Sequence, residues 1–429
     1  MTKKAWWIAA ASATAVVVAG VAGVGVACQQ RYAALEHGPA VQVVASQPLL
    51  EPAQPTGEVD VAALRARLEQ LAADPALATF GAKVTEVGSG QVLLDAASTT
   101  PLRPASSTKV LTASAALVEL GAQDRIVTQV VEGELPGTVV IKAAGDVWMT
   151  KEAIGELAEQ IKSAHPEVTG VFIDTSVWSG ETILQGWNPA DVDAGFVAPL
   201  EPAMINGARL GGEVDGDVPR SHTPAHDVAA ALAEQLGVTT VGQATAPQGA
   251  AVVAKVASPS LSERIAAMMV HSDNVMAEAI GREVAVHRGV TADAAGATQS
   301  TLEVLAQAGF DLEGVTLQDN SGLSVDNRIP PALLEALVRS AATDTQLRAL
   351  LPTLPVAGGS GTLEQRYGQL DGRGWVRAKT GTLDNTSALA GTVVSRSGRL
   401  YSFGMISNGS QITAARGALD ALASALHDA

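Results

Sequence analysis

Hydrophobic and polar positions follow a helical or a strand period along most of this chain. Apolar residues recur every three or four positions over 59–73, which predicts an amphipathic helix. Residues 80–96 indicate two strands, because two strand-like runs flank the turn residues Gly88-Ser89-Gly90. A helical pattern over 106–120 predicts a second helix that begins soon after Pro104.

The pattern changes to short strands and turns mixed with helices over 121–257. A helix-rich region follows, with helical periods over 261–270, 273–286 and 299–309. The tail has three strand-like runs and a final helix. Strands near both chain ends predict one antiparallel sheet flanked by helices, an α/β (α+β) fold. We expect this main domain to comprise 58–120 and 258–429, with 121–257 as an inserted mixed α/β domain.

The chain begins with a long apolar segment. Lys3 and Lys4 precede an uncharged stretch from Ala5 to Cys28. As a helix these residues would reach about 36 Å, enough to cross a hydrocarbon core of roughly 30 Å. The positive charge before the stretch predicts that this end faces the cytoplasm and that the bulk of the chain lies outside.

Three interpretations of residues 1–30 stay open: an uncleaved membrane anchor through residues 5–27, a cleaved signal peptide, and lipidation of Cys28. The anchor is favoured because a secretory apolar region usually has about 7–15 residues. All three place the folded part outside the cytoplasm, either anchored to the membrane or secreted. Residues 31–57 contain four prolines and no sustained period, which predicts a stalk.

Composition excludes some classes of partner. The chain has 28 basic and 44 acidic residues, a formal net charge of −16, and no basic run. Phosphate binding needs an excess of lysine and arginine, so we expect no nucleic-acid partner. The single cysteine excludes an intrachain disulfide. The mean hydropathy of +0.20 argues against a mainly disordered chain.

A first candidate for chemistry is Ser106-Ser107-Thr108-Lys109, at the start of a predicted helix. Residues three apart share a helix face, so Lys109 can reach the hydroxyl of Ser106. A serine hydroxyl needs a base to become a nucleophile, and an unprotonated lysine can be that base, whereas arginine keeps its proton. Taken alone, the motif also fits a capping serine and an exposed lysine.

Two further motifs follow, Ser272-Asp273-Asn274 at a helix junction and Lys379-Thr380-Gly381-Thr382 in a predicted strand. Serine, aspartate and asparagine, the residues of the Ser272-Asp273-Asn274 motif, are preferred helix-capping residues. Alternatively, Ser272 passes a proton to a leaving group while Asn274 binds the substrate backbone. In the strand, a glycine allows a second backbone to approach, which suits an edge to which a peptide adds, with Lys379 beside a carboxylate.

The joint occurrence of the three motifs favours the functional interpretation. Only nine of 429 residues are lysines, and two of the seven outside the amino-terminal tail fall in these motifs. Penicillin-binding proteins and class A β-lactamases share the combination. From about Phe80 to Asn408 the chain resembles the low-molecular-mass class C penicillin-binding proteins, the D-alanyl-D-alanine carboxypeptidase/endopeptidase family. Resembling segments are PASSTKVLTASAAL, GWNPADVDAGFVAPLEPAMINGARL, QDNSGLSVDNRI, LPVAGGSGTLEQR and VRAKTGTLDNTSALAGTV.

The resemblance implies a serine β-lactamase/D,D-peptidase-like fold and a serine D,D-carboxypeptidase, with D,D-endopeptidase activity as an addition. Ser106 would be acylated by the penultimate D-alanine of a peptidoglycan stem peptide, releasing D-alanine. Lys109 would be the base and Ser272 the proton relay, and water would then deacylate Ser106. Neither a metal nor another cofactor is implied, and β-lactams would be covalent inhibitors.

Substrate binding is also implied by the resemblance. Asn274 would position the substrate, and Lys379, Thr380 and Thr382 would hold its terminal carboxylate. The N–H groups of Ser106 and Thr382 would form the oxyanion hole. Two rivals on the same scaffold stay open, a β-lactamase-like hydrolase or esterase and a non-catalytic penicillin-binding sensor.

Two features of the sequence depart from the family pattern, and one pair of histidines suggests a different kind of site. Ser106 and Ser272 are 272 − 106 = 166 residues apart, shorter than in relatives with two inserted domains. The glycine-rich segment often found in the insert is AAGDVWMT here. His222 and His226 have a spacing that suits two metal ligands on one helix, but Pro224 between them favours a turn and a helix start.

Overall fold

The computed structural model describes residues 4, 20–32, 57–164 and 167–429. The chain divides into two units, Met1–Ala53 and Gln54–Ala429. In the former, residues 20–32 are helical and exposed, while most of the predicted anchor, 5–19, lies outside the described residues. No helix within the described ranges is both long and apolar enough to span a membrane.

The main sheet joins the two ends of the larger unit, as the sequence predicts. Its strands run in the order β10-β11-β12-β1-β2 and all neighbours are antiparallel. All eight residues of β1 pair with β12, from Thr79 opposite Asn408 to Glu86 opposite Tyr401. The strand bounds are β1 Thr79–Glu86, β2 Val92–Ala96, β10 Val376–Leu383, β11 Thr386–Val394 and β12 Leu400–Asn408.

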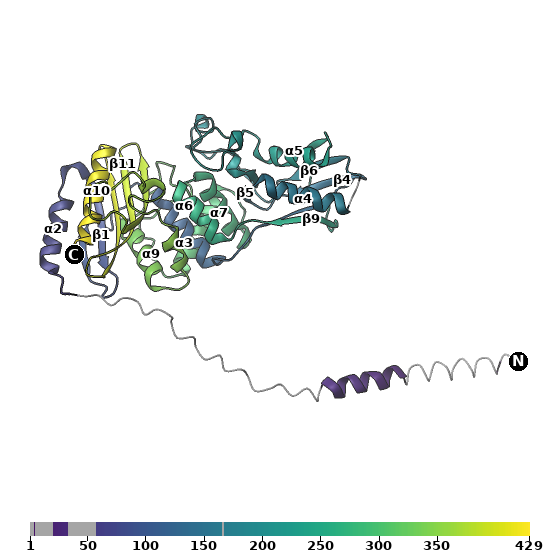
Figure 1. Ribbon diagram of the computed structural model, residues 1–429, viewed down its shortest axis with the longest axis horizontal. Helices are drawn as coiled ribbons and strands as arrows, with labels where there is room; N and C mark the ends of the chain where they lie inside the picture. Colours follow the sequence, from purple (N-terminus) through teal and green to yellow (C-terminus); the bar gives the residue numbers. More distant parts are fainter. Residues whose placement is uncertain (1–3, 5–19, 33–56, 165–166) are drawn as a thin grey trace. The chain divides into compact units, whose positions relative to one another are not determined.

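Helices cover both faces of this sheet, and Figure 1 shows α2 and α10 on one side and α9, α3 and α6 on the other. Strand side chains alternate between the faces, so Leu389 of β11 lies in the core with α10 and Ala388 in the core with α9. The helices are α2 Val61–Ala72, α3 Lys109–Glu119, α6 Leu261–His271, α7 Asn274–His287, α8 Ala294–Gln307, α9 Pro331–Thr343 and α10 Ile412–His427.

Two details differ from the predicted elements. Helix α9 was not predicted, although Pro331 stands at its first turn, where proline is tolerated, and a regular apolar face follows. The predicted helix over 106–120 begins as a 3₁₀ turn, Ala105–Thr108, and continues as α3. This tighter turn contains the candidate nucleophile.

A second sheet lies within residues 127–257 and has the order β8-β6-β4-β3-β9. It is mixed, because β4, β6 and β8 are parallel while β3 is antiparallel to β4 and β9. Helices α4 and α5 pack on one face. The elements of this region are β3 Val127–Glu132, β4 Thr138–Lys142, β5 Asp146–Met149, α4 Lys151–Ala164, β6 Gly170–Asp174, β7 Ala203–Ile205, α5 Pro224–Leu236, β8 Val241–Gln243 and β9 Val252–Ala257. Strands β5 and β7 pair with each other in a separate two-stranded sheet.

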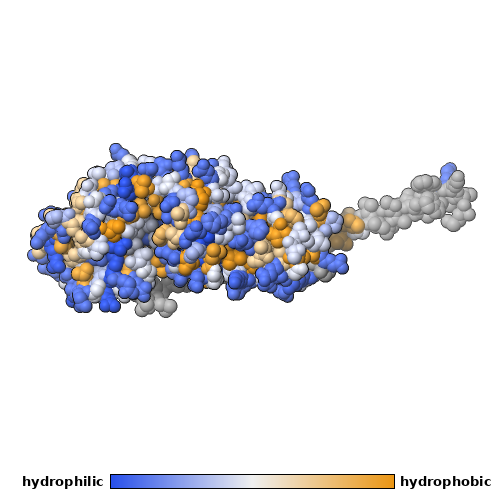
Figure 2. All heavy atoms as spheres, turned by 90° about the horizontal axis from the view of Figure 1, so that it is seen from above, coloured by the Kyte–Doolittle hydropathy of each residue, from blue (hydrophilic) through white to orange (hydrophobic). Residues whose placement is uncertain are grey.

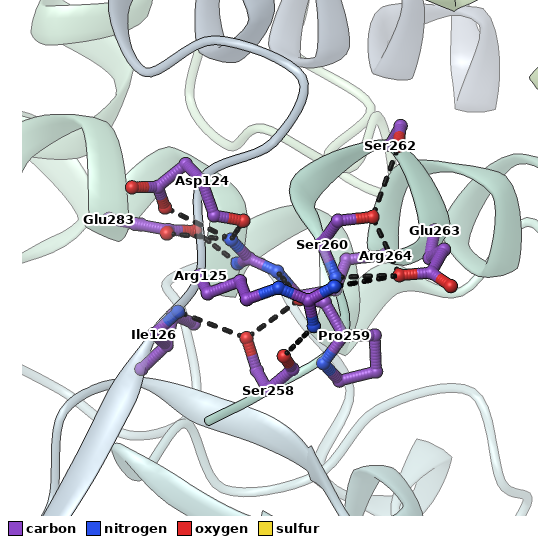
Figure 3. A network of polar contacts seen from close by, with 10 residues as sticks. All are labelled: Asp124, Arg125, Ile126, Ser258, Pro259, Ser260, Ser262, Glu263, Arg264 and Glu283. Atoms are coloured by element: carbon purple, nitrogen blue, oxygen red, sulfur yellow. Dashed lines mark hydrogen bonds and ion pairs between the residues drawn. The ribbon is translucent and has the colours of Figure 1, made fainter. Parts of the chain in front are cut away.

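The chain segments that enter and leave the second sheet lie side by side (Figure 3). The Ile126 N–H donates to Ser258 Oγ at 3.0 Å, and the Ser258 N–H donates to the Ile126 carbonyl at 2.8 Å. Arg264 of α6, whose side chain is fully buried, pairs with Asp124 at 3.3 Å and donates to Glu283 of α7 at 2.9 Å. The base of the second sheet is therefore tied to α6 and α7.

Large apolar side chains are mainly buried in three clusters. On the face that Figure 2 draws, hydrophobic residues lie in small groups between polar ones. Small scattered groups of this kind are usual on a protein surface and do not by themselves indicate a binding site.

The buried carboxyl of Asp146 in β5 makes stability depend on pH. Burial raises its pKa from 3.8 to about 6, against the hydrogen bond from the Trp148 N–H and the charge of Arg264. A pKa raised on folding stabilises the folded state below about pH 4, and this contribution is lost as the pH rises through about 6. Asp146→Asn keeps the acceptor without the titration.

We predict that Asp146→Asn and the wild-type protein have similar free energies of unfolding at pH 4. At pH 8 the variant should be more stable, by up to about 3 kcal/mol at about 1.4 kcal/mol for each pKa unit. Urea denaturation at both pH values measures the difference. A difference that does not change with pH would contradict the prediction.

Candidate active site

The chain around Ser106 is held in an unusual conformation by two close neighbours. Ala105, immediately before it, has φ of 49°, in the left-handed region that non-glycine residues rarely adopt. A Cβ at Gly322 would lie 2.0 Å from the Ala105 carbonyl oxygen, and one at Gly381 would lie 2.4 Å from the Pro104 carbonyl oxygen. Only glycine therefore lets these two segments pack against the nucleophile turn.

This contact refines the expectation for Gly381. The sequence indicated that a glycine in the strand would let a substrate backbone approach. In the structure, the backbone in contact with Gly381 is that of Pro104 in the same chain. The glycine therefore brings β10 next to the turn that contains Ser106.

Hydrogen bonds distinguish Ser106 from the hydroxyls beside it. The buried Ser107 hydroxyl donates to the Pro104 carbonyl at 2.7 Å, and Thr108 donates to the Ala105 carbonyl at 2.9 Å. Ser106 Oγ lies 3.1 Å from Lys109 Nζ. Ser106 is therefore the hydroxyl of this turn that faces the predicted base.

Lys109 Nζ has three oxygen neighbours. Besides Ser106 Oγ, they are Asn274 Oδ1 and the Ser321 carbonyl oxygen, both at 2.7 Å. The amide of Asn274 is oriented by its Nδ2, which donates to the Phe196 carbonyl at 3.0 Å. Asn274 Oδ1 and the Ser321 carbonyl can only accept. They take the two hydrogens of a neutral amine, so its lone pair is directed at the Ser106 hydroxyl.

The protonation of Lys109 reflects two opposing effects. Burial lowers the pKa of its amine to about 8, while the negative charges of Asp319, Asp273 and Glu278 raise it. With this pKa, about a tenth of the amines are neutral at pH 7. A neutral Lys109 is therefore accessible near neutral pH.

The second motif combines a cap with two site residues. Ser272 ends α6 with φ of 57°, and Asp273 caps α7 by accepting from the Met276 N–H at 2.9 Å. Ser272 Oγ accepts from Lys379 Nζ at 2.9 Å. Asp273 is therefore the cap of this motif, while Ser272 and Asn274 each contact one of the two lysines.

The side chain of Lys379 is fully buried, and its amine contacts the Ser272 hydroxyl in the same site. Burial, followed by the positive charge of Lys109, holds its pKa well below the ordinary lysine value. Its Nζ also donates to the Thr380 carbonyl at 2.8 Å. A substrate carboxylate beside this amine would favour its charged form, because an opposite charge raises a lysine pKa.

Strand β10 forms one border of the main sheet and carries the third motif. The Thr380 hydroxyl donates to Thr362 Oγ1, and Arg416 of α10 donates to Thr382 Oγ1, both at 2.8 Å. A cavity of about 930 Å³ lies in front of the motifs. Four predicted site residues line it, namely Ser106, Ser272, Asn274 and Thr382.

Several buried residues that support Lys109 were not predicted from the sequence. Glu278 Oε1 accepts from the N–H groups of Asn320 and Ser321 at 2.9 and 2.8 Å. Burial raises the pKa of Glu278 to about 8, with a further increase from Asp319. These contacts fix the turn whose Ser321 carbonyl binds Lys109. The turn lies in QDNSGLSVDNRI, a segment recognised from its resemblance without a role for its residues.

The two histidines considered as metal ligands lie apart from this site and make separate contacts. His222 Nε2 lies 2.9 Å from Asp193 Oδ1, and His226 Nδ1 lies 3.9 Å from Asp227 Oδ1. Both side chains are exposed. Among the residues with a described placement, no group of three or more histidine, cysteine, aspartate or glutamate side chains is arranged to hold a metal ion.

Comparison with known proteins identifies the family of this chain. The sequence matches the D-Ala-D-Ala carboxypeptidase 3 (S13) family over residues 64–219 and 213–428. It is 42% identical over 376 residues to "Carboxypeptidase DacB" of Mycolicibacterium smegmatis, which covers 82% of this chain and 81% of that protein.

Solved structures share the fold. The crystal structure of penicillin binding protein 4 (dacB) from Haemophilus influenzae has a TM-score of 0.70 at 22% identity and covers 85% of this chain and 98% of that one. The same protein in complex with a β-lactam has a TM-score of 0.65 at 21% identity, with the same coverage. The predicted fold class is therefore confirmed. By the extent of the sequence match, the chain belongs to the D-Ala-D-Ala carboxypeptidase 3 (S13) family.

Proposed function

We propose that this protein is a serine D,D-carboxypeptidase that cleaves the D-Ala-D-Ala end of peptidoglycan stem peptides through an acyl-enzyme at Ser106. The hydrogen bonds of Lys109 carry the proposal: two neighbours that only accept direct the lone pair of its neutral amine at Ser106. Membership of the S13 family supports the substrate class. The β-lactam complex of the Haemophilus influenzae protein supports inhibition by β-lactams.

Acylation begins when Lys109 Nζ takes the proton of Ser106 Oγ, which attacks the carbonyl carbon of the penultimate D-alanine. The N–H groups of Ser106 and Thr382 stabilise the oxyanion. As the C–N bond breaks, the proton that Lys109 took from Ser106 is passed through the Ser272 hydroxyl to the leaving amine, so Lys109 is neutral again. The Ser272 hydroxyl is held by Lys379 Nζ at 2.9 Å. D-alanine leaves, and Ser106 carries the rest of the stem peptide as an ester.

Deacylation uses water in place of the leaving amine. Neutral Lys109 takes a proton from the water that attacks the ester carbonyl carbon, and it returns this proton to Ser106 Oγ as the C–Oγ bond breaks. Asn274 positions the substrate backbone, and Lys379, Thr380 and Thr382 hold the terminal carboxylate. A cross-linked stem is the second substrate that we propose, and its cleavage is endopeptidase activity.

The division of the chain into domains and its location in the cell are part of the same proposal. Residues 58–120 and 258–429 are the D,D-peptidase domain, and 121–257 are an inserted domain. Residues 31–57 are a stalk, and the apolar segment in 1–30 is a membrane anchor or a signal segment. The uncharged apolar run supports this location outside the cytoplasm, as does the substrate, a component of the cell wall.

Ser106→Ala should abolish labelling by a fluorescent penicillin, while Ser107→Ala should retain it. The reason is geometric, because the Ser107 hydroxyl is already bonded to the Pro104 carbonyl and Ser106 faces Lys109. Gel fluorescence of the two variants and the wild-type protein measures this. Labelling lost only in Ser107→Ala would move the nucleophile by one residue.

Lys109→Arg should slow acylation by at least about 10²-fold, the usual contribution of a general base. Arginine keeps the positive charge but does not release its proton near neutral pH. Stopped-flow acylation with a chromogenic β-lactam gives the rate. Acylation of Lys109→Arg at nearly the wild-type rate would remove Lys109 from its role.

Incubation of the protein with a stem pentapeptide and with a cross-linked muropeptide, followed by mass spectrometry, tests the reaction itself. We expect loss of one D-alanine from the pentapeptide and, for endopeptidase activity, two separated stems. A sensor would bind penicillin and leave both unchanged. Rapid hydrolysis of penicillin with no peptide cleavage would favour the β-lactamase-like alternative.

A further inference from the structure

The aspartate of the Ser272-Asp273-Asn274 motif is bound by two buried arginines. Arg209 and Arg220 each donate an N–H to Asp273 Oδ2, at 2.6 and 2.7 Å. The exposed fraction of the side chain is 2% for each arginine and 0% for the aspartate. Burial alone would raise the pKa of Asp273, but the charges of Arg220 and Arg209 hold it well below its ordinary value. The three groups are therefore a buried ionic cluster.

The other N–H groups of the two arginines bind backbone carbonyls of one segment, 195–216. Arg209 donates to Asn206 and Gly216 at 3.1 and 3.0 Å. Arg220 donates to Gly195 and Gly207 at 2.8 and 2.7 Å. Such contacts offset the cost of removing two guanidinium groups from water. The segment and Asp273 are thus held as one body.

The same segment contacts the next residue of the motif. The Phe196 carbonyl accepts from Asn274 Nδ2 at 3.0 Å and so turns Asn274 Oδ1 toward Lys109. The stretch 195–220 therefore holds Asp273 through two side chains and Asn274 through one carbonyl. It lies within the residues that we propose to be inserted.

Helix capping does not require this cluster. Asp60 and Asp293 cap α2 and α8 by accepting from one backbone N–H each. Within the described residues, neither has an arginine at hydrogen-bond distance, whereas Asp273 has two. The additional partners of Asp273 call for an explanation beyond the stability of α7.

The explanation lies in the residues on either side of Asp273. Ser272 has a strained φ of 57°, and its Oγ must stay 2.9 Å from Lys379 Nζ. Asn274 Oδ1 must stay 2.7 Å from Lys109 Nζ. A small rotation of the Asp273 backbone would move both groups away from the two lysines.

We propose that Arg209 and Arg220 are positioning residues, which act through Asp273 to hold Ser272 against Lys379 and Asn274 against Lys109. The inserted segment then forms part of the catalytic apparatus rather than an appendage to it. This inference rests on the proposed acylation of Ser106. It adds a requirement for two residues that do not touch the reacting atoms.

The test is the rate of acylation by a chromogenic β-lactam in Arg209→Met and Arg220→Met. We expect about 10²-fold slower acylation, the scale of a displacement of about 1 Å in an active site. Arg209→Lys and Arg220→Lys keep the charge and one donor, so their rates should recover only in part, to about tenfold below the wild-type rate. Each rate is expressed per folded, acylatable molecule, from the end point of the reaction.

Arg264 provides the matched control. Its side chain is also fully buried and ion-paired, with Asp124 and Glu283, and it links the second sheet to α6 and α7 without touching the motif (Figure 3). Arg264→Met and Arg264→Lys should lower the melting temperature, yet acylate within about threefold of the wild-type rate.

The outcomes separate the claims. Wild-type rates in folded Arg209→Met and Arg220→Met, or an equal loss in Arg264→Met, would overturn the positioning role alone. If the methionine variants do not fold, the lysine variants decide: the proposal requires slower acylation in Arg209→Lys and Arg220→Lys, by about tenfold, than in Arg264→Lys. No acylation of the wild-type protein would overturn the proposed function together with this inference.

Discussion

The burial of one lysine amine between three oxygens is the constraint on which the site depends. Lys109 Nζ lies within 3.1 Å of Ser106 Oγ, Asn274 Oδ1 and the Ser321 carbonyl oxygen. These groups come from three separate parts of the chain, and all must be in place for the amine to lose a proton and face the serine. Burial lowers its pKa, while nearby carboxylates keep the shift moderate.

The surrounding fold holds each of these oxygens by a different device. Close packing of Gly322 and Gly381 fixes the turn that contains Ser106. Glu278 binds the turn that presents the Ser321 carbonyl. The two arginines bind Asp273, which directly precedes Asn274 in the chain. Buried ionic groups are poor sources of net stability. Their concentration around this site is more readily explained by the precision that proton transfer requires.

Sequence patterns predicted the features that depend on residues close together in the chain, and missed contacts between residues far apart in it. Local periodicity indicated the strands and most helices, and strands at both ends predicted the shared sheet. The motifs led to Ser106, Lys109 and Ser272, because spacing within a turn or a strand is local information. Arg209 and Glu278 act on partners 64 and 43 residues away, respectively. No single pattern reports such pairs, and helix α9 was missed although its pattern was present.

The most direct test of the account is the pH dependence of the second-order rate constant for acylation of the wild-type protein by a β-lactam that does not titrate between pH 5 and 10. If neutral Lys109 is the base, the rate constant should rise about tenfold per pH unit and level off near pH 8, the value to which burial lowers the pKa of Lys109. A rate constant that is independent of pH from 6 to 9, or that continues to rise beyond pH 10, would contradict it.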